Sequence, residues 1–379
     1  MCRQTQLVMA LFCCFSLPRL APLGLAQPGP AQPGLAPQSS PVSPLAPRAE
    51  DATAPRESGR RITLDVVVTD KSGNPVPGLQ QQDFTLLDDK QPQAILSFRA
   101  TDLATNDSTH GVDSPLQAIF LVDAVNTSFR SVGYERQELQ KFLQKDDGKL
   151  SLPTSLVILT DTSQGQSQPT LDGNALVETL NSNQSGLRTI GRSQGFYGGA
   201  DRFQISIDTL EKLTSHLATQ PGRKLLIWLS PGWPLLSGPG VQLSAKNQAW
   251  LFQTVVGLST DLRDARITLY SVDPLGMEEG MGRTFYYENF LKGVSSANRV
   301  QNGNLALQVL AAQSGGRVLT SSNDIAKLIT SCLEDSRAFY TLSFDSPPAD
   351  HANEYHSLQI KISKPGLSAH TRTGYYAQR

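Results

Sequence analysis

The chain has almost no cysteine in the part that is expected to fold. Three of its four cysteines lie within the first fourteen residues, which leaves Cys332 alone in the remaining chain. One cysteine cannot form an internal disulfide, so the fold must be stabilised by a hydrophobic core. Cys332 falls on the apolar side of an expected helix at residues 323–335. We therefore predict a buried, unreactive thiol, with a reactive one as the alternative.

Strong charge and catalytic signatures are also missing. The formal net charge is −1 and 18% of the residues are charged, so no strong electrostatic field favours nucleic acid or an anionic membrane. The five histidines show no metal-ligand spacing such as H-x-x-x-H, and none accompanies a recognisable nucleophile motif. These absences predict a protein that does not bind nucleic acid and is not an enzyme.

The sequence lacks an apolar run of the length that spans a membrane, about 20 residues. A shorter apolar core, Leu7–Leu17, follows the basic Arg3 and precedes the small residues of Gly24–Ala26. This order is typical of a secretory signal peptide, so we predict a signal at residues 1–26 and export to the periplasm or the extracellular space. Residues 27–60 are rich in Pro, Ala, Ser and Gln, and we expect a disordered linker there.

Both ends of the remaining chain alternate apolar and polar residues. At the N-terminal end, ITLDVVVTD places every second apolar side chain on one face, and a hairpin pattern follows around residues 84–98. Three alternating segments near the C-terminus, residues 338–345, 355–363 and 367–377, have the same period. Because three or four short strands make a poor core alone, we predict that residues 61–113 and 336–379 pair into one β-sandwich. The alternative is two separate β appendages.

The middle of the chain, residues 114–335, alternates apolar strands with amphipathic helices. The expected strands are residues 118–122, 156–160, 225–229, 267–272 and 317–319. The expected helices are near residues 133–145, 174–182, 203–219, 244–263, 303–313 and 323–335. Such alternation predicts an α/β domain with a doubly wound, mostly parallel sheet, inserted into the β-sandwich.

The first strand of this domain ends in polar residues. The run QAIFLVDAVNTS changes from buried-strand character to Asp123, Asn126 and Thr127, where open α/β sheets place their ligand sites. Carboxylate, amide and hydroxyl oxygens suit a hard divalent cation. Asp161 and Asp273 also follow apolar strands and could lie beside Asp123. The alternative for each aspartate is a structural role, in which it caps the following turn or helix.

Five pieces of the sequence resemble the bacterial von Willebrand factor A-related secreted proteins that are abundant in acidobacteria. They run in order from about Ile62 to Ala377: VVVTDKSGNPVPGLQQQDFTLLDDKQPQAILSF, AIFLVDAVNT, PGRKLLIWLSPGWP, ITLYSVDPLG and AFYTLSFDSPPADHANEYHSLQIKISKPGLSAHTRTGYYA. The resemblance implies a von Willebrand A-like domain, and it implies no enzymatic activity. A-domains of this type bind partners through a metal site at the carboxyl edge of the sheet.

The chain departs from that metal motif at several positions, and the threonine of the family's second loop has no clear match in residues 190–202. The family's Asp-x-Ser-x-Ser run matches here with Asp123 first, but Val125 stands at the first serine and Thr127 at the second. The aspartate of the third loop is replaced by Pro231, in the run Ser230-Pro231-Gly232. The site implied by the resemblance is therefore degenerate. Mg²⁺ or Ca²⁺ bound by Asp123, Asn126 and Thr127 is one alternative, and a metal-free site is the other.

These observations lead to two functional hypotheses. The first is a secreted, adhesion-type module that binds an unknown protein or surface ligand through the carboxyl-edge loops, including Ser230 and Gly232. The second is a structural or accessory subunit of an envelope assembly that contains a metal-free A-like domain.

Overall fold

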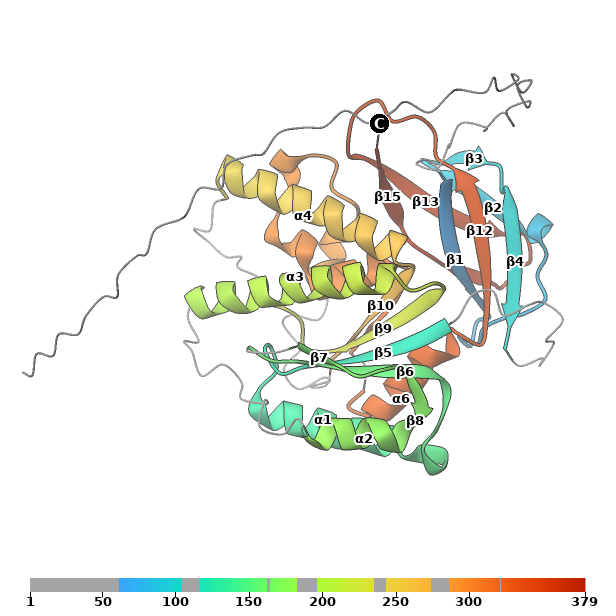
Figure 1. Ribbon diagram of the computed structural model, residues 1–379. Coiled ribbons are helices and arrows are strands. Elements are labelled where there is room, and N and C mark those ends of the chain that lie inside the picture. The colour runs from blue at the N-terminus through green and yellow to red at the C-terminus, as the bar shows by residue number, and fades with distance from the viewer. Residues whose placement is uncertain are drawn as a thin grey trace, which may run out of the picture. The chain divides into compact units, whose positions relative to one another are not determined.

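The computed structural model describes residues 61–103, 116–161, 164–182, 196–234, 243–273, 286–320 and 322–378 (Figure 1). The predicted signal peptide and linker lie outside these residues. Residues 55–379 form one unit by their internal contacts. No helix among the described residues combines the length and the apolar character needed to cross a membrane.

The central sheet has the predicted doubly wound, mostly parallel arrangement. Its strands are β5 (Leu116–Asp123), β6 (Lys149–Leu159), β7 (Gln164–Gln166), β8 (Thr170–Asp172), β9 (Arg223–Leu229), β10 (Ile267–Val272) and β11 (Val318–Leu319). The order is β11-β10-β9-β5-β6-β7, and β8 also pairs with β6. Strands β5, β6, β9, β10 and β11 are parallel, whereas β7 and β8 run antiparallel to β6. All seven residues of β9 are buried, as expected for a strand covered on both faces.

Helices cover both faces of this sheet (Figure 1). They are α1 (Phe129–Leu143), α2 (Gly173–Ser182), α3 (Phe196–Ala218), α4 (Ala245–Asp264), α5 (Leu307–Gln313) and α6 (Ile325–Glu334). Apolar residues of α3, α4 and α5 form one core with the sheet, and those of α1, α2 and α6 form a second core on the other face. Cys332 is buried in the second core, and burial raises the pKa of its thiol, so the predicted unreactive character is supported.

The two ends of the chain form a β-sandwich, as predicted. Its strands are β1 (Arg61–Thr69), β2 (Phe84–Asp88), β3 (Gln91–Gln93), β4 (Ser97–Asp102), β12 (Ala338–Asp345), β13 (Glu354–Ile362), β14 (Ser368–His370) and β15 (Gly374–Ala377). One sheet has the order β14-β1-β12-β4 and the other β15-β13-β2-β3, so each contains strands from both ends. Side chains of both sheets share one apolar core. The alternative of separate β appendages is therefore wrong.

Some element boundaries differ from the sequence prediction. The segment at residues 367–377 is two strands rather than one, and β14 and β15 belong to different sheets. Strands β7 and β8 were not expected, because each is only three residues long and has little apolar character. Helix α1 begins at Phe129 rather than near residue 133, since the Ser128 hydroxyl accepts a hydrogen bond from the Ser131 amide at 3.3 Å and caps the helix.

Charged side chains connect the sandwich to the central domain. Arg266, between α4 and β10, forms an ion pair with Asp65 of β1, and the Thr341 hydroxyl donates to the same carboxylate at 3.0 Å. Arg372 is buried and donates to the Ser259 carbonyl of α4 at 3.2 Å, and its burial lowers its pKa to about 10. The partly buried contacts of Arg266 and the buried contact of Arg372 fix the sandwich against α4 and the turn that follows it.

Candidate functional site

The candidate site lies where the strand order of the central sheet reverses. Strand β5 is the first strand of the sheet in the chain, and its neighbours β6 and β9 are on opposite sides. Val122 pairs with Leu229, so Asp123, the last residue of β5, and Ser230, which follows β9, lie at the same edge. A crevice outside the carboxyl ends of such strands is the usual ligand position in open α/β sheets.

Asp123 is fully buried and accepts four hydrogen bonds. Its Oδ1 accepts the backbone N–H groups of Val125 at 3.0 Å and Asn126 at 2.9 Å. Its Oδ2 accepts the Asn126 side-chain amide at 2.8 Å and the Trp228 indole N–H at 3.0 Å. A carboxylate offers about four lone-pair positions. Asp123 therefore holds the loop after β5 and joins it to β9, which is the structural role considered as the alternative.

Asn126 and Thr127 turn into the same buried region. The Asn126 amide group also donates to the Ser206 hydroxyl of α3 at 2.9 Å, so the loop is attached to a second element. The Asn126 Oδ1 and the Thr127 Oγ1 are buried and have no hydrogen-bond partner among the described residues. The Asn126 side chain thus lies against Asp123 at the sheet edge.

Glu135 is an additional acidic residue that the sequence interpretation missed. It lies on the inner face of α1 with 0% exposure, and neither carboxyl oxygen has a hydrogen-bond partner among the described residues. Burial raises its pKa well above the ordinary value, and the negative charges of Asp123 and Asp273 raise it further. The Thr127 hydroxyl lowers the pKa of Glu135, but by less than burial raises it. Glu135 is therefore a buried carboxylic acid that favours its protonated form.

The remaining aspartates do not complete a carboxylate cluster. Asp161 is exposed, whereas Asp123 is fully buried. Asp273 is half-buried and its charge reaches Glu135. In the described part of the chain, Asp123, Asp161 and Asp273 do not form a group whose oxygens all lie within 4.8 Å of one another.

The loop after β9 is shaped by Ser230 and Gly232. Ser230 is buried, and its hydroxyl accepts the Gly232 N–H at 3.1 Å. Gly232 has a φ of +102°, and a Cβ there would lie 2.5 Å from the Gln308 side-chain nitrogen. Gln308 donates to the Pro231 carbonyl at 3.3 Å and closes the loop against α5. Ser230 thus shapes the predicted binding loop from inside, and its side chain is not on the surface.

The residues at this edge do not fit the metal site that the family resemblance implies. A cation bound to Asp123 would have to displace one of its four N–H donors, since both oxygens are fully engaged. Val125 and Pro231 offer no side-chain oxygen at the other two positions. The unpartnered oxygens of Asn126, Thr127 and Glu135 are buried, and burial raises the pKa of Glu135, which disfavours the carboxylate form that would bind a cation.

The surface of the same edge carries a large aromatic side chain. Phe129, the first residue of α1, follows the Asp123 loop directly and is 71% exposed. The helix cap at Ser128 and the hydrogen bonds of Asp123 fix the backbone on its N-terminal side. An exposed aromatic side chain on a rigid backbone, as here at the start of α1, is a common anchor of protein interfaces.

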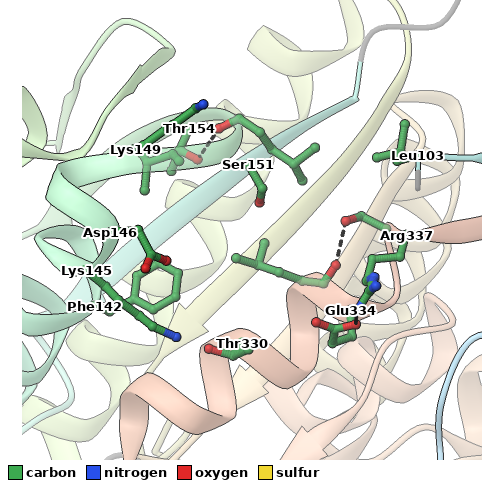
Figure 2. Close-up of a pocket in the computed structure, with 14 residues that line it drawn as sticks. Leu103, Phe142, Lys145, Asp146, Lys149, Ser151, Thr154, Thr330, Glu334 and Arg337 are labelled. Atoms are coloured by element: carbon green, nitrogen blue, oxygen red, sulfur yellow. Dashed lines mark hydrogen bonds and ion pairs between the residues drawn. The ribbon is translucent and has the colours of Figure 1, made fainter. Parts of the chain in front are cut away.

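A cavity of about 470 Å³ lies at the opposite, amino edge of the sheet. Figure 2 shows Phe142, Lys145 and Asp146 on one side of it and Thr330, Glu334 and Arg337 on the other. The beginning of β6 lines it as well. The cavity is therefore separate from the Asp123 loop, which follows the carboxyl end of β5.

Comparisons with known proteins show a distant likeness in fold. No protein-family model and no curated sequence matches the chain. Among solved structures, human COPII-coat protein Sec24c is similar at 11% identity and a TM-score of 0.31, over 70% of this chain and 44% of that chain. The pilus adhesin SpaC of Lactobacillus rhamnosus GG is similar at 9% identity and a TM-score of 0.35, over 87% and 44%. A von Willebrand factor type A protein of Catenulispora acidiphila is similar at 8% identity and a TM-score of 0.31, over 85% and 74%.

Proposed function

We propose that the chain is an exported, non-enzymatic protein-binding module whose binding surface is the carboxyl edge of the central sheet and does not require a metal. The observation that carries this proposal is the saturated Asp123. Four N–H donors hold its carboxylate at 2.8–3.0 Å, so the loop is organised without a cation. A preorganised loop loses little conformational entropy when it binds.

Phe129 is the proposed anchor of this surface. Its ring is 71% exposed, while the preceding loop is held by buried contacts, so the ring can enter a partner's apolar pocket at low entropic cost. Aromatic residues near the centre of an interface commonly contribute 2 kcal/mol or more, which corresponds to about 30-fold in affinity. Ser230 and Asp123 act indirectly, by shaping the two loops beside it.

The proposal predicts that Phe129→Ala weakens partner binding by about 30-fold and leaves the fold intact. Leu171→Ala is the matched control, since Leu171 is 54% exposed on β8 beside the beginning of β6, at the opposite edge. Immobilised wild type and both variants would be titrated with an envelope extract of the cells that make the protein. We expect saturable binding that survives EDTA. The affinity should be about 30-fold weaker in Phe129→Ala and unchanged in Leu171→Ala.

A photo-crosslinking amino acid at positions 129 and 171 then shows where the partner contacts the chain. Crosslinking at position 129 but not at position 171 supports the proposal. Equal crosslinking at the two positions, or none at position 129, contradicts it. Loss of binding in EDTA would contradict the metal-independent mode. A partner that stays bound in fixed stoichiometry through size-exclusion chromatography would instead identify a permanent assembly subunit.

A further inference from the structure

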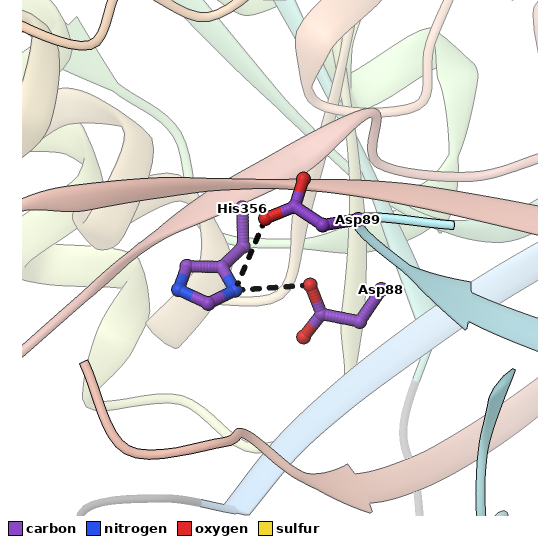
Figure 3. A group of neighbouring side chains, drawn as sticks. All are labelled: Asp88, Asp89 and His356. Carbon is purple, nitrogen blue, oxygen red and sulfur yellow. Dashed lines mark hydrogen bonds and ion pairs between the residues drawn. The ribbon is translucent and has the colours of Figure 1, made fainter. Parts of the chain in front are cut away.

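A second group of potential ligand atoms lies in the β-sandwich, away from the proposed binding edge. Asp88 ends β2, Asp89 begins the tight turn to β3, and His356 lies on the neighbouring strand β13 (Figure 3). The turn places Asp89 and Lys90 at φ values of 46° and 69°, which directs the Asp89 side chain back toward His356. One atom from each of Asp88, Asp89 and His356 lies within 4.8 Å of the others.

The Nδ1 atom of His356 faces both carboxylates. It lies 3.0 Å from Asp88 Oδ1 and 3.6 Å from Asp89 Oδ2. The other oxygen of each carboxylate is held by separate donors. Asp88 Oδ2 accepts the Tyr375 hydroxyl at 2.6 Å, and Asp89 Oδ1 accepts the Ser357 amide at 2.9 Å and its hydroxyl at 2.8 Å. One oxygen of each aspartate is thus positioned, and the second oxygen faces the imidazole.

The charge of this group is poorly compensated by the protein. The side chain of His356 is 9% exposed, and its Nε2 is buried without a hydrogen-bond partner among the described residues. Within the described chain, the ion pairs of Asp88 and Asp89 involve His356 alone. Two carboxylates and one imidazole nitrogen therefore meet at this point, and these are ligand types that bind divalent metals.

We propose that Asp88 Oδ1, Asp89 Oδ2 and His356 Nδ1 bind a divalent transition metal of the Zn²⁺ type. Metal–ligand distances of about 2.0–2.2 Å place neighbouring atoms of a tetrahedral shell about 3.3–3.6 Å apart. The measured separations from Nδ1, 3.0 and 3.6 Å, are close to that value. On binding, the single proton of the neutral ring moves through solvent from Nδ1 to Nε2, and the freed Nδ1 lone pair binds the metal. The 55% exposure of Asp89 leaves the fourth position open to water.

This site would connect segments 268 positions apart in the sequence. Tyr375 of β15 stacks on the His356 ring at 5.1 Å, so it orients both the imidazole and Asp88. A metal at this point would join β2, β13 and the Asp89 turn, and would stabilise the folded sandwich by an amount that rises with the ratio of metal concentration to Kd.

Calorimetric titration of the full chain with Zn²⁺ tests the proposal, with Co²⁺ absorption as a second readout of tetrahedral coordination. Asp89→Asn is the key variant, because it keeps the Ser357 contacts at an exposed position and removes one ligand charge. We expect one Zn²⁺ per chain and at least about 10-fold weaker binding in Asp89→Asn. A given Zn²⁺ concentration should raise the thermal midpoint of the wild type more than that of the variant. Glu354→Gln is the matched control on the same strand.

Two results would overturn the inference. One is the absence of saturable Zn²⁺ binding at micromolar concentrations in the wild type. The other is equal affinity in the wild type and in Asp89→Asn, which would assign the metal to another part of the chain. His356→Asn gives independent evidence, since an asparagine amide can still donate to Asp88 but is a poor zinc ligand. Retained affinity in that variant would also contradict the site.

Discussion

Asp123→Ala is expected to lower the free energy of unfolding by about 3 kcal/mol or more. The substitution leaves several donors without their acceptor at once. The Trp228 indole N–H and the Val125 amide lose bonds that are buried, and Asn126 loses two more. Each buried donor without a partner costs about 1–3 kcal/mol, and relaxation of the loop recovers part of the sum.

Urea unfolding of purified wild type and variant measures this effect. Asp161→Ala is the matched control, since Asp161 also follows a strand of the sheet but is exposed, and its change should stay within about 0.5 kcal/mol. Trp228→Phe removes one donor and leaves a cavity where the buried indole packed, so we expect a loss of about 2 kcal/mol or more. The hydrogen-bond part of that loss should disappear when Asp123 is already alanine.

The same experiment separates the structural role of Asp123 from a metal-ligand role. If Asp123 is the anchor of the loop, Mg²⁺ and Ca²⁺ leave the unfolding midpoint of the wild type unchanged. An increase in stability with either ion that disappears in Asp123→Ala would show that the carboxylate binds metal and would contradict the saturated geometry. A fully stable Asp123→Ala protein would contradict it as well.

Much of the fold could be predicted from local patterns. The short apolar runs at β5, β9 and β10 indicate buried parallel strands, and the alternating ends indicate half-buried ones that need each other. The division of residues 367–377 between two sheets could not be read from the sequence. The division depends on the strands that the two halves pair with. β14 pairs with β1, about 300 residues away along the chain, whereas β15 pairs with β13, about 20 residues away.

The contacts of the candidate site also depend on residues that are distant in the sequence, so they could be predicted only in part. The position of Asp123 at the end of β5 followed from the sequence, but its partner Trp228 did not. That contact arises because β9 pairs with β5, which only the topology of the sheet determines. Glu135 had a local signal that was missed, since it occupies the buried stripe with Val132 and Leu139. A carboxyl group on an otherwise apolar helix face marks either a buried acid or a ligand.

The second large effect concerns the pH dependence of stability through Glu135. Burial and the charges of Asp123 and Asp273 raise the pKa of Glu135 in the folded state. In the unfolded chain the group returns to the ordinary glutamate pKa of about 4.3. Between these two values the folded state binds a proton that the unfolded state has lost. The contribution of Glu135 to the free energy of unfolding is therefore fully present below about pH 4.3. It declines by about 1.4 kcal/mol per pH unit as the pH rises toward the pKa of the folded state.

Glu135→Gln removes this titration and keeps the size of the side chain. The buried amide has its own cost, so the informative quantity is the difference between variant and wild type as a function of pH. Urea unfolding at pH 5, 6, 7 and 8 measures the free energy of unfolding of both proteins. We expect the value for the variant minus that for the wild type to increase by about 1.4 kcal/mol per pH unit until the pKa of folded Glu135 is reached. Glu178→Gln, an exposed substitution on α2, should follow the wild-type slope. Parallel curves for wild type and Glu135→Gln would mean that Glu135 is ionised in the fold, and its carboxylate would then need a buried cation beside Asn126 and Thr127.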